Sequence, residues 1–358
     1  MPIQPPVRYA PQLETTQPTE QETISGLIDQ FDIILEKTAE DYGHAVRSVH
    51  AKAHGLIEGE MTVKDGLPSE LAQGLFAKSG EYPVFMRLST NAGDILPDAV
   101  SLPRGLAIKV VGVDGPRLPD ADGVTQDFVM VNGPVFQAPN AEKFLSSLKL
   151  LARTTDRMEG TKTVLSSVLQ TVNKGLEAVG VASPTVQSLG GAPNVDPLGE
   201  TYFSVTPFRY GDYVAKFRVK PVSADLTKRT GTEIDASVRD DAIRETVQAE
   251  MQDTVAEWEF QVQLCRDLEA QPIEDPTVEW QEEDAPFVTV GTITAAPQDS
   301  WSDAKVQKVD EEMRFSVWTG LADHQPLGGI NRARKVTYEH SAEFRAKFNG
   351  CPFHEPRP

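Results

Sequence analysis

The sequence predicts an α+β fold in which a closed antiparallel barrel of eight strands is surrounded by helices. Two groups of about four strand-like runs stand on either side of a helical stretch, and loops containing Gly, Pro and Asp separate the runs. Closing the two groups into one barrel removes the exposed edges that an open sheet would have. Helical periodicity before the first group and after the second places further helices around the barrel.

The first helix is predicted after an extended arm of residues 1–20, which is rich in Pro, Gln and Thr. Apolar residues then recur at helical spacing, and the pattern stops before Gly43, a residue type common at helix ends. We therefore expect an amphipathic helix with this apolar face: Ile24, Leu27, Ile28, Phe31, Ile34 and Leu35.

The first group of strands is predicted between Leu56 and about Asn132, with the runs VFMRLST, RGLAIKVVGV and TQDFVMVN. The second group contains the runs YVAKFRVKPV, WEFQVQLC and FVTVGTITA. Their β-branched and aromatic content is typical of strands.

Two further helical regions complete the fold. Residues 141 to about 180 have helical periodicity with a break at Gly180, and INRARKVTYEHSAEFRAKF near the C-terminus reads as mostly helical. We expect one domain over residues 21–349, followed by a tail of residues 350–358, with both ends of the chain flexible.

The charge of the chain argues against a nucleic-acid or anionic-membrane partner, because its formal net charge is -19. Its N-terminus has no secretory pattern, and no apolar stretch reaches membrane-spanning length. Cys265 and Cys351 are too few for a disulfide framework. We therefore expect a cytoplasmic protein without a membrane span.

The residues that suggest chemistry lie in four separate motifs. Near the C-terminus, Tyr338 has Arg334 four residues before it and Arg345 seven residues after it, so a helix would bring all three to one side. The motifs RSVHAKAHG, RLSTNAG and DFVMVNGPVF supply these upstream candidates: Arg47, Val49, His50, Arg87, Ser89 and Asn132.

These residue types fit a tyrosinate-ligated haem. A phenolate is a strong axial ligand for ferric iron, and the Arg334 guanidinium would stabilise the Tyr338 phenolate by charge and hydrogen bonding. His50 could move a proton between the two oxygens of a peroxide, with its ring oriented by Ser89. Asn132 could orient the peroxide. Gathered arginines in an acidic chain suit a local anion such as the haem propionates.

Together, and in this order, the motifs resemble those of the catalase superfamily, and the chain is similar to short catalase-related haem peroxidases. RSVHAKAHG resembles the segment with the distal histidine, which implies that role for His50, with Val49 beside the haem. DFVMVNGPVF resembles the distal asparagine segment, and RARKVTYEHSAEFR resembles the proximal helix with the iron ligand Tyr338. The resemblance assigns these further haem contacts: Arg47, Arg87, Arg345, Phe136 and Phe144.

The resemblance implies a catalase-like barrel with haem b and cleavage of hydrogen peroxide or organic hydroperoxides through a ferryl intermediate. An organic reductant would be a second substrate of a peroxidase, and we expect a homo-oligomer. The helical C-terminal region of full-length catalases is missing, so we expect no NADPH site. Gln137 and Glu339 depart from the family pattern, where an aromatic residue and a proline are expected.

Four other interpretations remain open. A fatty-acid hydroperoxide isomerase or dehydratase, similar to allene oxide synthases, shares this fold, although Val49 stands where such enzymes place a hydroxyl residue before the distal histidine. A barrel that only carries haem or a lipid would not need both His50 and Asn132. His44, His50 and His54 could bind zinc, but no carboxylate completes a hydrolytic zinc motif and Lys52 lies between the histidines, so we expect His44 and His54 to be structural. Some arginines are expected to be ordinary surface ion-pair partners: Arg104, Arg218 and Arg332.

Overall fold

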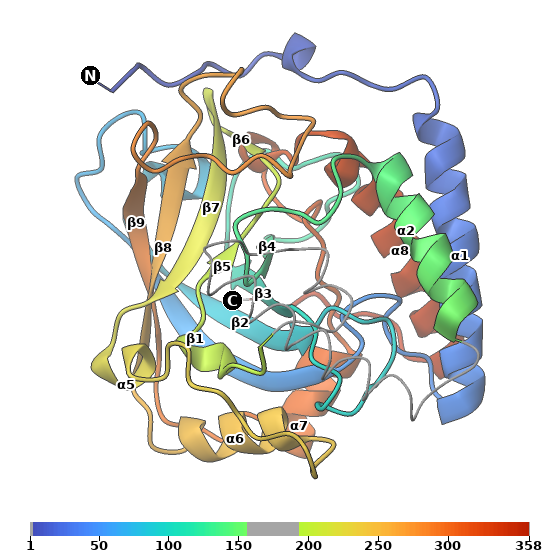
Figure 1. Cartoon of the computed structure of the whole chain (residues 1–358). Coiled ribbons are helices and arrows are strands. Elements are labelled where there is room, and N and C mark those ends of the chain that lie inside the picture. The colour runs from blue at the N-terminus through green and yellow to red at the C-terminus, as the bar shows by residue number, and fades with distance from the viewer. Residues whose placement is uncertain (1–2, 156–192, 358) are drawn as a thin grey trace, which may run out of the picture.

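The chain is described from a computed structural model, which places residues 3–155 and 193–357. In these residues, nine antiparallel strands form one sheet, and β5 pairs with both β4 and β7, which closes eight of the strands into a barrel (Figure 1). The ninth strand, β6, extends the pairing of β7. The strands are β1 Ala53–Val63, β2 Gly80–Thr90, β3 Arg104–Val111, β4 Thr125–Val131, β5 Tyr202–Phe203, β6 Phe208–Tyr210, β7 Tyr213–Pro221, β8 Ala256–Leu264 and β9 Phe287–Ala295.

The predicted closed barrel of eight strands is therefore confirmed. Its interior is filled by alternate residues of each strand, such as Leu106 and Ile108 of β3, because successive side chains point to opposite faces. Rings from several strands meet at its centre, where the centroids of Phe128 and Phe260 are 4.7 Å apart. The buried imidazole of His324 lies among these rings and accepts a hydrogen bond of 3.0 Å from the backbone nitrogen of Leu75.

Helices surround the barrel as the sequence predicts. The α-helices of the described residues are α1 Glu20–Tyr42, α2 Ala141–Thr155, α5 Ala224–Thr227, α6 Ala242–Met251, α7 Asp303–Lys305 and α8 Gly329–Asn349. Shorter turns are η1 Pro11–Leu13, η2 Gly74–Ala77, η3 Pro197–Gly199, the π-helical turn η4 Val306–Glu311 and η5 Ala322–His324. None of these helices is long and apolar enough to cross a membrane.

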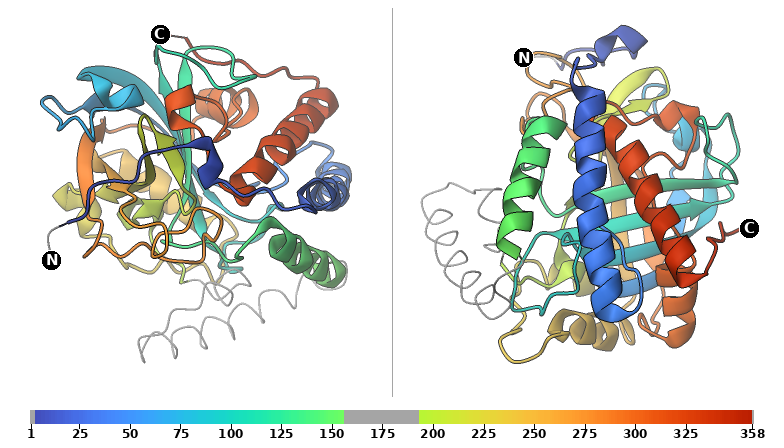
Figure 2. Two further views of the ribbon diagram at one scale, coloured as in Figure 1. Left: turned by 90° about the horizontal axis from the view of Figure 1, so that it is seen from above. Right: turned by 90° about the vertical axis from the view of Figure 1, so that its right-hand side faces the viewer.

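Three long helices, α1, α2 and α8, lie side by side along one flank of the barrel (Figure 2). They share a small core that includes Leu27 of α1, Leu145 of α2 and Ile330 of α8. The first helix ends at Gly43, whose φ of 63° is the left-handed conformation that glycine adopts without steric cost. The second part of the helix predicted up to Gly180 lies outside the described residues.

The two ends of the described chain pack against this body. The arm before α1 pairs with the barrel through a hydrogen bond of 2.8 Å from Val7 N to Cys265 O. After α8, Glu355 forms an ion pair of 2.8 Å with Lys109, which is itself buried and paired with Asp127. Glu355 of the tail therefore lies next to the outer face of β3 and β4.

Candidate active site

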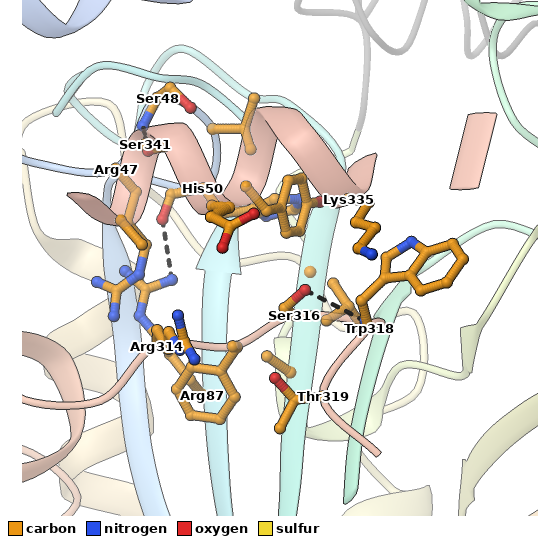
Figure 3. A pocket seen from close by; sticks show the side chains of 18 of the residues that line it. Arg47, Ser48, His50, Arg87, Arg314, Ser316, Trp318, Thr319, Lys335 and Ser341 are labelled. Carbon is orange, nitrogen blue, oxygen red and sulfur yellow. Dashed lines mark hydrogen bonds between the residues drawn. The ribbon is translucent and has the colours of Figure 1, made fainter. Parts of the chain in front are cut away.

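A pocket of about 970 Å³, counted together with its space open to solvent, lies between strands β2–β4 and helix α8. Its lining combines the loop before β1 with β2, β3, β4, the segment before α8 and α8 itself. Figure 3 shows Arg47 and Arg314 at one end of the pocket and Lys335 and Trp318 at the other. These predicted site residues line it: Arg47, Val49, His50, Arg87, Ser89, Tyr338 and Arg345.

His50, which lines the pocket from the loop before β1, is held in an unusual backbone conformation. Its φ is 55°, in the left-handed region that residues other than glycine seldom occupy. Its backbone nitrogen donates to Asn91 O over 3.2 Å, and its carbonyl oxygen accepts from Arg87 Nη1 over 2.9 Å. Anchoring on both sides of the residue fixes the direction in which the imidazole leaves the backbone.

The imidazole of His50 is oriented by the contact that the sequence predicts. Its Nδ1 lies 3.0 Å from Ser89 Oγ on β2. On β3, Gly105 leaves room for the ring, because a Cβ atom there would lie only 2.4 Å from His50 Cε1. Burial, with Arg87 and other nearby arginines, lowers the pKa of His50 to about 3, so the ring is neutral near neutral pH.

Tyr338 and Arg334 meet on α8. The hydroxyl oxygen of Tyr338 accepts hydrogen bonds from Arg334 Nε over 3.3 Å and Nη2 over 3.2 Å. Arg334 Nη1 also donates to Asn331 Oδ1 over 3.2 Å, and Asn331 is fully buried. Asn331 in turn bonds to Thr206 and to the carbonyl oxygen of Pro207, so the guanidinium is fixed against the barrel. Two N–H groups therefore converge on the phenolic oxygen of Tyr338, a residue that lines the pocket.

Three arginines from separate elements, Arg47, Arg87 and Arg345, form an arginine cluster at one end of the pocket. Asp310 of η4 lies among them, and its Oδ1 accepts from Arg47 Nη1 over 2.5 Å and from Arg87 Nε over 2.8 Å. Its backbone oxygen accepts from Arg345 Nη2 over 2.9 Å. Although burial alone would raise the pKa of the Asp310 carboxyl, Arg87 and Arg47 hold it well below its usual range.

Four predicted residues do not line the pocket. Arg334 reaches it only through Tyr338, and the other three lie elsewhere. The amide of Asn132 is engaged at the end of β4, where Oδ1 accepts from Arg104 N over 2.7 Å and Nδ2 donates to Glu200 over 2.9 Å. Phe136 and Phe144 pack against each other beside the core shared by α1, α2 and α8, with ring centroids 5.5 Å apart. None of these three side chains lines the pocket.

The reading of Arg104 as a surface residue is wrong. Its side chain is 1% exposed and donates to Thr90 Oγ1, to the Leu102 carbonyl and to Asn194 Oδ1. Burial lowers the pKa of the Arg104 guanidinium. Its role is to organise the strand ends near Asn132, and an isolated arginine in the sequence carries no sign of this.

Arg218 and Arg332, by contrast, form ion pairs as expected. Arg218 pairs with Glu282, and Arg332 pairs with Glu14, Glu20 and Glu274, which ties the N-terminal arm to α8.

The histidines considered for zinc do not gather. The Nε2 atom of His44 pairs with Glu311 over 2.9 Å, whereas His54 is buried and its Nε2 contacts Thr90 Oγ1 over 2.6 Å. Within residues 3–155 and 193–357, no group of three or more His, Cys, Asp or Glu side chains is arranged to hold a metal ion.

Sequence reasoning missed Asp310, Gly105 and Asn331. Asp310 lies in a polar stretch without periodicity, so nothing marks it in the sequence. Gly105 is the second residue of the strand-like run RGLAIKVVGV, and a glycine inside a strand is a known sign of close approach by another group. Asn331 precedes Arg334 by three residues, which is the spacing of helical neighbours.

Comparison with known proteins places this geometry in a family. The family model described as Catalase matches residues 27–304, which is more than half of the chain. The chain belongs to the catalase family. The match ends before α8, so it does not include Tyr338 or Arg334. A comparison with curated proteins found no match.

Solved catalases share the fold of this catalase-family chain. Catalase A from Saccharomyces cerevisiae is 18% identical with a TM-score of 0.62, and the alignment covers 87% of this chain and 63% of that one. A fungal catalase is 16% identical with a TM-score of 0.59, covering 87% and 62%. A bacterial catalase is 17% identical with a TM-score of 0.58, covering 90% and 63%. The chain thus spans about 63% of the length of the yeast and bacterial catalases.

Proposed function

We propose that this chain is a haem-dependent hydroperoxidase that cleaves hydrogen peroxide, organic hydroperoxides or both, with Tyr338 as the iron ligand. The observation that carries the proposal is one pocket lined by both the His50–Ser89 pair and the Arg334-supported Tyr338, with the arginine cluster at its end. Membership of the catalase family supports the same reaction class.

The pocket residues fit haem in their donor chemistry. A phenolic oxygen that accepts two guanidinium N–H bonds is suited to bind ferric iron as an anion. At the end of the pocket, the arginine cluster presents cations suited to two propionates. The pocket lining between Tyr338 and the arginine cluster also contains small and apolar residues, including Val49, Ala107 and Val129. Haem, when bound, would supply an iron that takes up a peroxide oxygen and exchanges electrons.

The proposed role of His50 is to accept a proton from the peroxide and return it to the departing oxygen. Because burial and nearby arginines lower its pKa to about 3, the imidazole is neutral at working pH and one ring nitrogen has a free lone pair. An imidazole of low pKa is a weak base, so it would hold the proton only briefly and give it up readily to the departing oxygen. Ser89 at Nδ1 fixes the ring so that the other nitrogen is available for this transfer. Val49 lines the pocket beside it and keeps this part of the site apolar.

The proposed role of Asn132, to orient the peroxide, requires a change from the described arrangement. Its Nδ2 donates to Glu200 and its Oδ1 accepts from Arg104 N, so both ends of the amide are already engaged. The amide must leave Glu200 to reach a ligand in the pocket. Burial raises the pKa of the Glu200 carboxyl, and protonation would weaken its hold on the amide.

Dioxygen release from hydrogen peroxide, measured with an oxygen electrode and divided by the haem content of each sample, tests the proposal. We expect turnover by the haem-loaded wild type and loss of turnover in His50→Ala with haem still bound. His340→Gln is the matched control, because that ring lies on α8 and pairs with Asp32. A His50→Ala variant with the wild-type rate per haem would refute the role of His50.

Organic hydroperoxides distinguish the peroxidase from the isomerase alternative. With a fatty-acid hydroperoxide, a peroxidase yields the alcohol and water and consumes two electrons and two protons, which two molecules of a one-electron phenolic reductant supply. An epoxide or ketol formed without reductant would instead favour the allene oxide synthase type. Product analysis by mass spectrometry with and without an added phenolic reductant separates the two results.

A further inference from the structure

Asp310 contacts the arginine cluster through both its side-chain carboxylate and its backbone carbonyl oxygen. Its side-chain Oδ1 accepts hydrogen bonds from Arg47 and Arg87, and its backbone oxygen accepts from Arg47 Nη2 over 2.8 Å and Arg345 Nη2 over 2.9 Å. The π-helical turn η4 thereby joins the loop before β1, strand β2 and helix α8. Because the backbone contacts need no carboxylate, the arginines keep these anchors when the side-chain charge is removed.

The charges of this cluster do not cancel. Three guanidinium groups and one carboxylate leave a net charge of +2 among Arg47, Arg87, Arg345 and Asp310. Crowding is severe enough that burial, together with Arg345 and Arg87, lowers the pKa of Arg47 well below its usual value. Like charges held this close repel one another, so the carboxylate stabilises the cluster while the pocket holds no other anion.

The same carboxylate must also oppose an anion that enters the pocket. It occupies donor atoms of Arg47 and Arg87 and adds a negative charge beside the ligand position. A ligand with two negative charges brings these four residues to neutrality. Two nearby charges have partners of their own, since Arg314 lies 3.7 Å from Glu355 and the Glu311 carboxylate pairs with His44. A third negative charge on the ligand would therefore have no partner in the cluster.

We propose that Asp310 is the resident counter-ion of the arginine cluster and limits it to two negative charges, so that the pocket selects a ligand with two carboxylates. This inference rests on the proposed function in one respect, that the ligand is the propionate pair of haem. Asp310 is thus a positioning and selectivity residue, not a catalytic one.

Asp310→Asn keeps a side-chain oxygen that accepts from the arginines but removes the charge. We expect the haem-free variant to unfold at a lower temperature than wild type, because the arginines lose their carboxylate. We expect the variant to bind haem about tenfold more tightly, as removal of one nearby negative charge in a partly buried site implies. With haem dimethyl ester, which lacks the carboxylates, the affinities of variant and wild type should be equal.

Glu312→Gln is the matched control. It removes the same charge two residues away, at a side chain that accepts from Gln307 Nε2 over 2.9 Å instead of from the cluster. Its haem affinity should stay within twofold of wild type. The inference is overturned if Asp310→Asn binds haem no more tightly than Glu312→Gln, or if its gain is the same with the dimethyl ester.

Two further results keep the test decisive. If wild type forms no stoichiometric haem complex, the proposed function fails. The counter-ion role is then tested by comparing the melting temperatures of haem-free Asp310→Asn and haem-free Glu312→Gln. Equal melting temperatures would refute that role. If Asp310→Asn does not fold, Arg47→Gln with Asp310→Asn, which keeps the net charge of +2, should fold, because the removed carboxylate is then no longer needed to offset a third guanidinium. Misfolding of that balanced variant as well would contradict the inference.

Discussion

Gly105→Ala tests how the barrel positions the imidazole of His50. A Cβ atom on Gly105 would lie 2.4 Å from His50 Cε1, 2.5 Å from Nδ1 and 3.0 Å from Ser89 Oγ. The ring must therefore move by about 1 Å to restore ordinary van der Waals contact, and this displacement breaks the 3.0 Å hydrogen bond to Ser89. Gly105 is not among the glycines with positive φ, so alanine brings no backbone penalty there.

The expected loss follows from that displacement. Misplacing a catalytic group by about 1 Å costs on the order of 100-fold in rate, and overpacking costs about 1–3 kcal/mol of stability. We therefore expect Gly105→Ala to remain folded and to bind haem, but to release dioxygen about 100-fold more slowly per haem. The assay is the oxygen electrode, with haem content measured on the same sample.

Gly133→Ala is the matched control, because a Cβ atom there meets nothing within 4 Å and we expect wild-type turnover. In a His50→Ala background, Gly105→Ala should cause no further loss, since the ring that it displaces is gone. Wild-type turnover by Gly105→Ala, or an equal loss in both backgrounds, would refute the proposed positioning of His50.

Two further predictions concern the proximal residue and the barrel interior. Arg334→Met removes both N–H donors to the Tyr338 oxygen, so we expect a shifted haem absorption spectrum and at least tenfold weaker haem retention. Lys347→Met, on the exposed face of α8, is the control and should have the spectrum and haem retention of wild type. An unchanged spectrum would show that Arg334 does not support the ligand. Burial lowers the pKa of His324 from 6.5 to about 3, so between these pH values the unfolded chain binds a proton that the folded chain does not. The free energy of unfolding should therefore fall as pH drops through this window, by up to about 1.4 kcal/mol per pH unit for this group, and His324→Gln should flatten the curve measured by urea unfolding. An identical slope in both proteins would contradict this account.

Sequence periodicity predicted those helices and strands whose bounds depend on their own residues. Helix α1 was expected to end before Gly43 and does, because its apolar face and the glycine are both local features. Strand β1 was not singled out, although its region was expected to contain strands. Its glycines break the apolar pattern, and Gly59 is needed because a Cβ atom would lie 2.4 Å from the Thr294 backbone oxygen of β9. Such a constraint comes from the partner strand and cannot be recognised from the sequence of β1 alone.

The residues of the candidate site likewise fall into those that short motifs predict and those that only long-range contacts reveal. The motifs around His50, Arg87 and Tyr338 were predicted from their sequence, and the fold brings them to one pocket. Asn132 was predicted to face that pocket, but the residue that engages its amide, Glu200, lies 68 positions later in the chain. Asp310 likewise acquires its meaning only when distant elements meet around it. Side chains whose role depends on several long-range contacts cannot be predicted from short motifs.

The most direct test of the central claim is the Soret absorbance of the haem-loaded chain, followed by stopped-flow after mixing with hydrogen peroxide and, separately, with cumene hydroperoxide. The account predicts a rapid change in wild type with at least one peroxide and its loss in His50→Ala at equal haem content. No change in the haem-loaded wild type with either peroxide would contradict the account and favour a barrel that only carries its ligand.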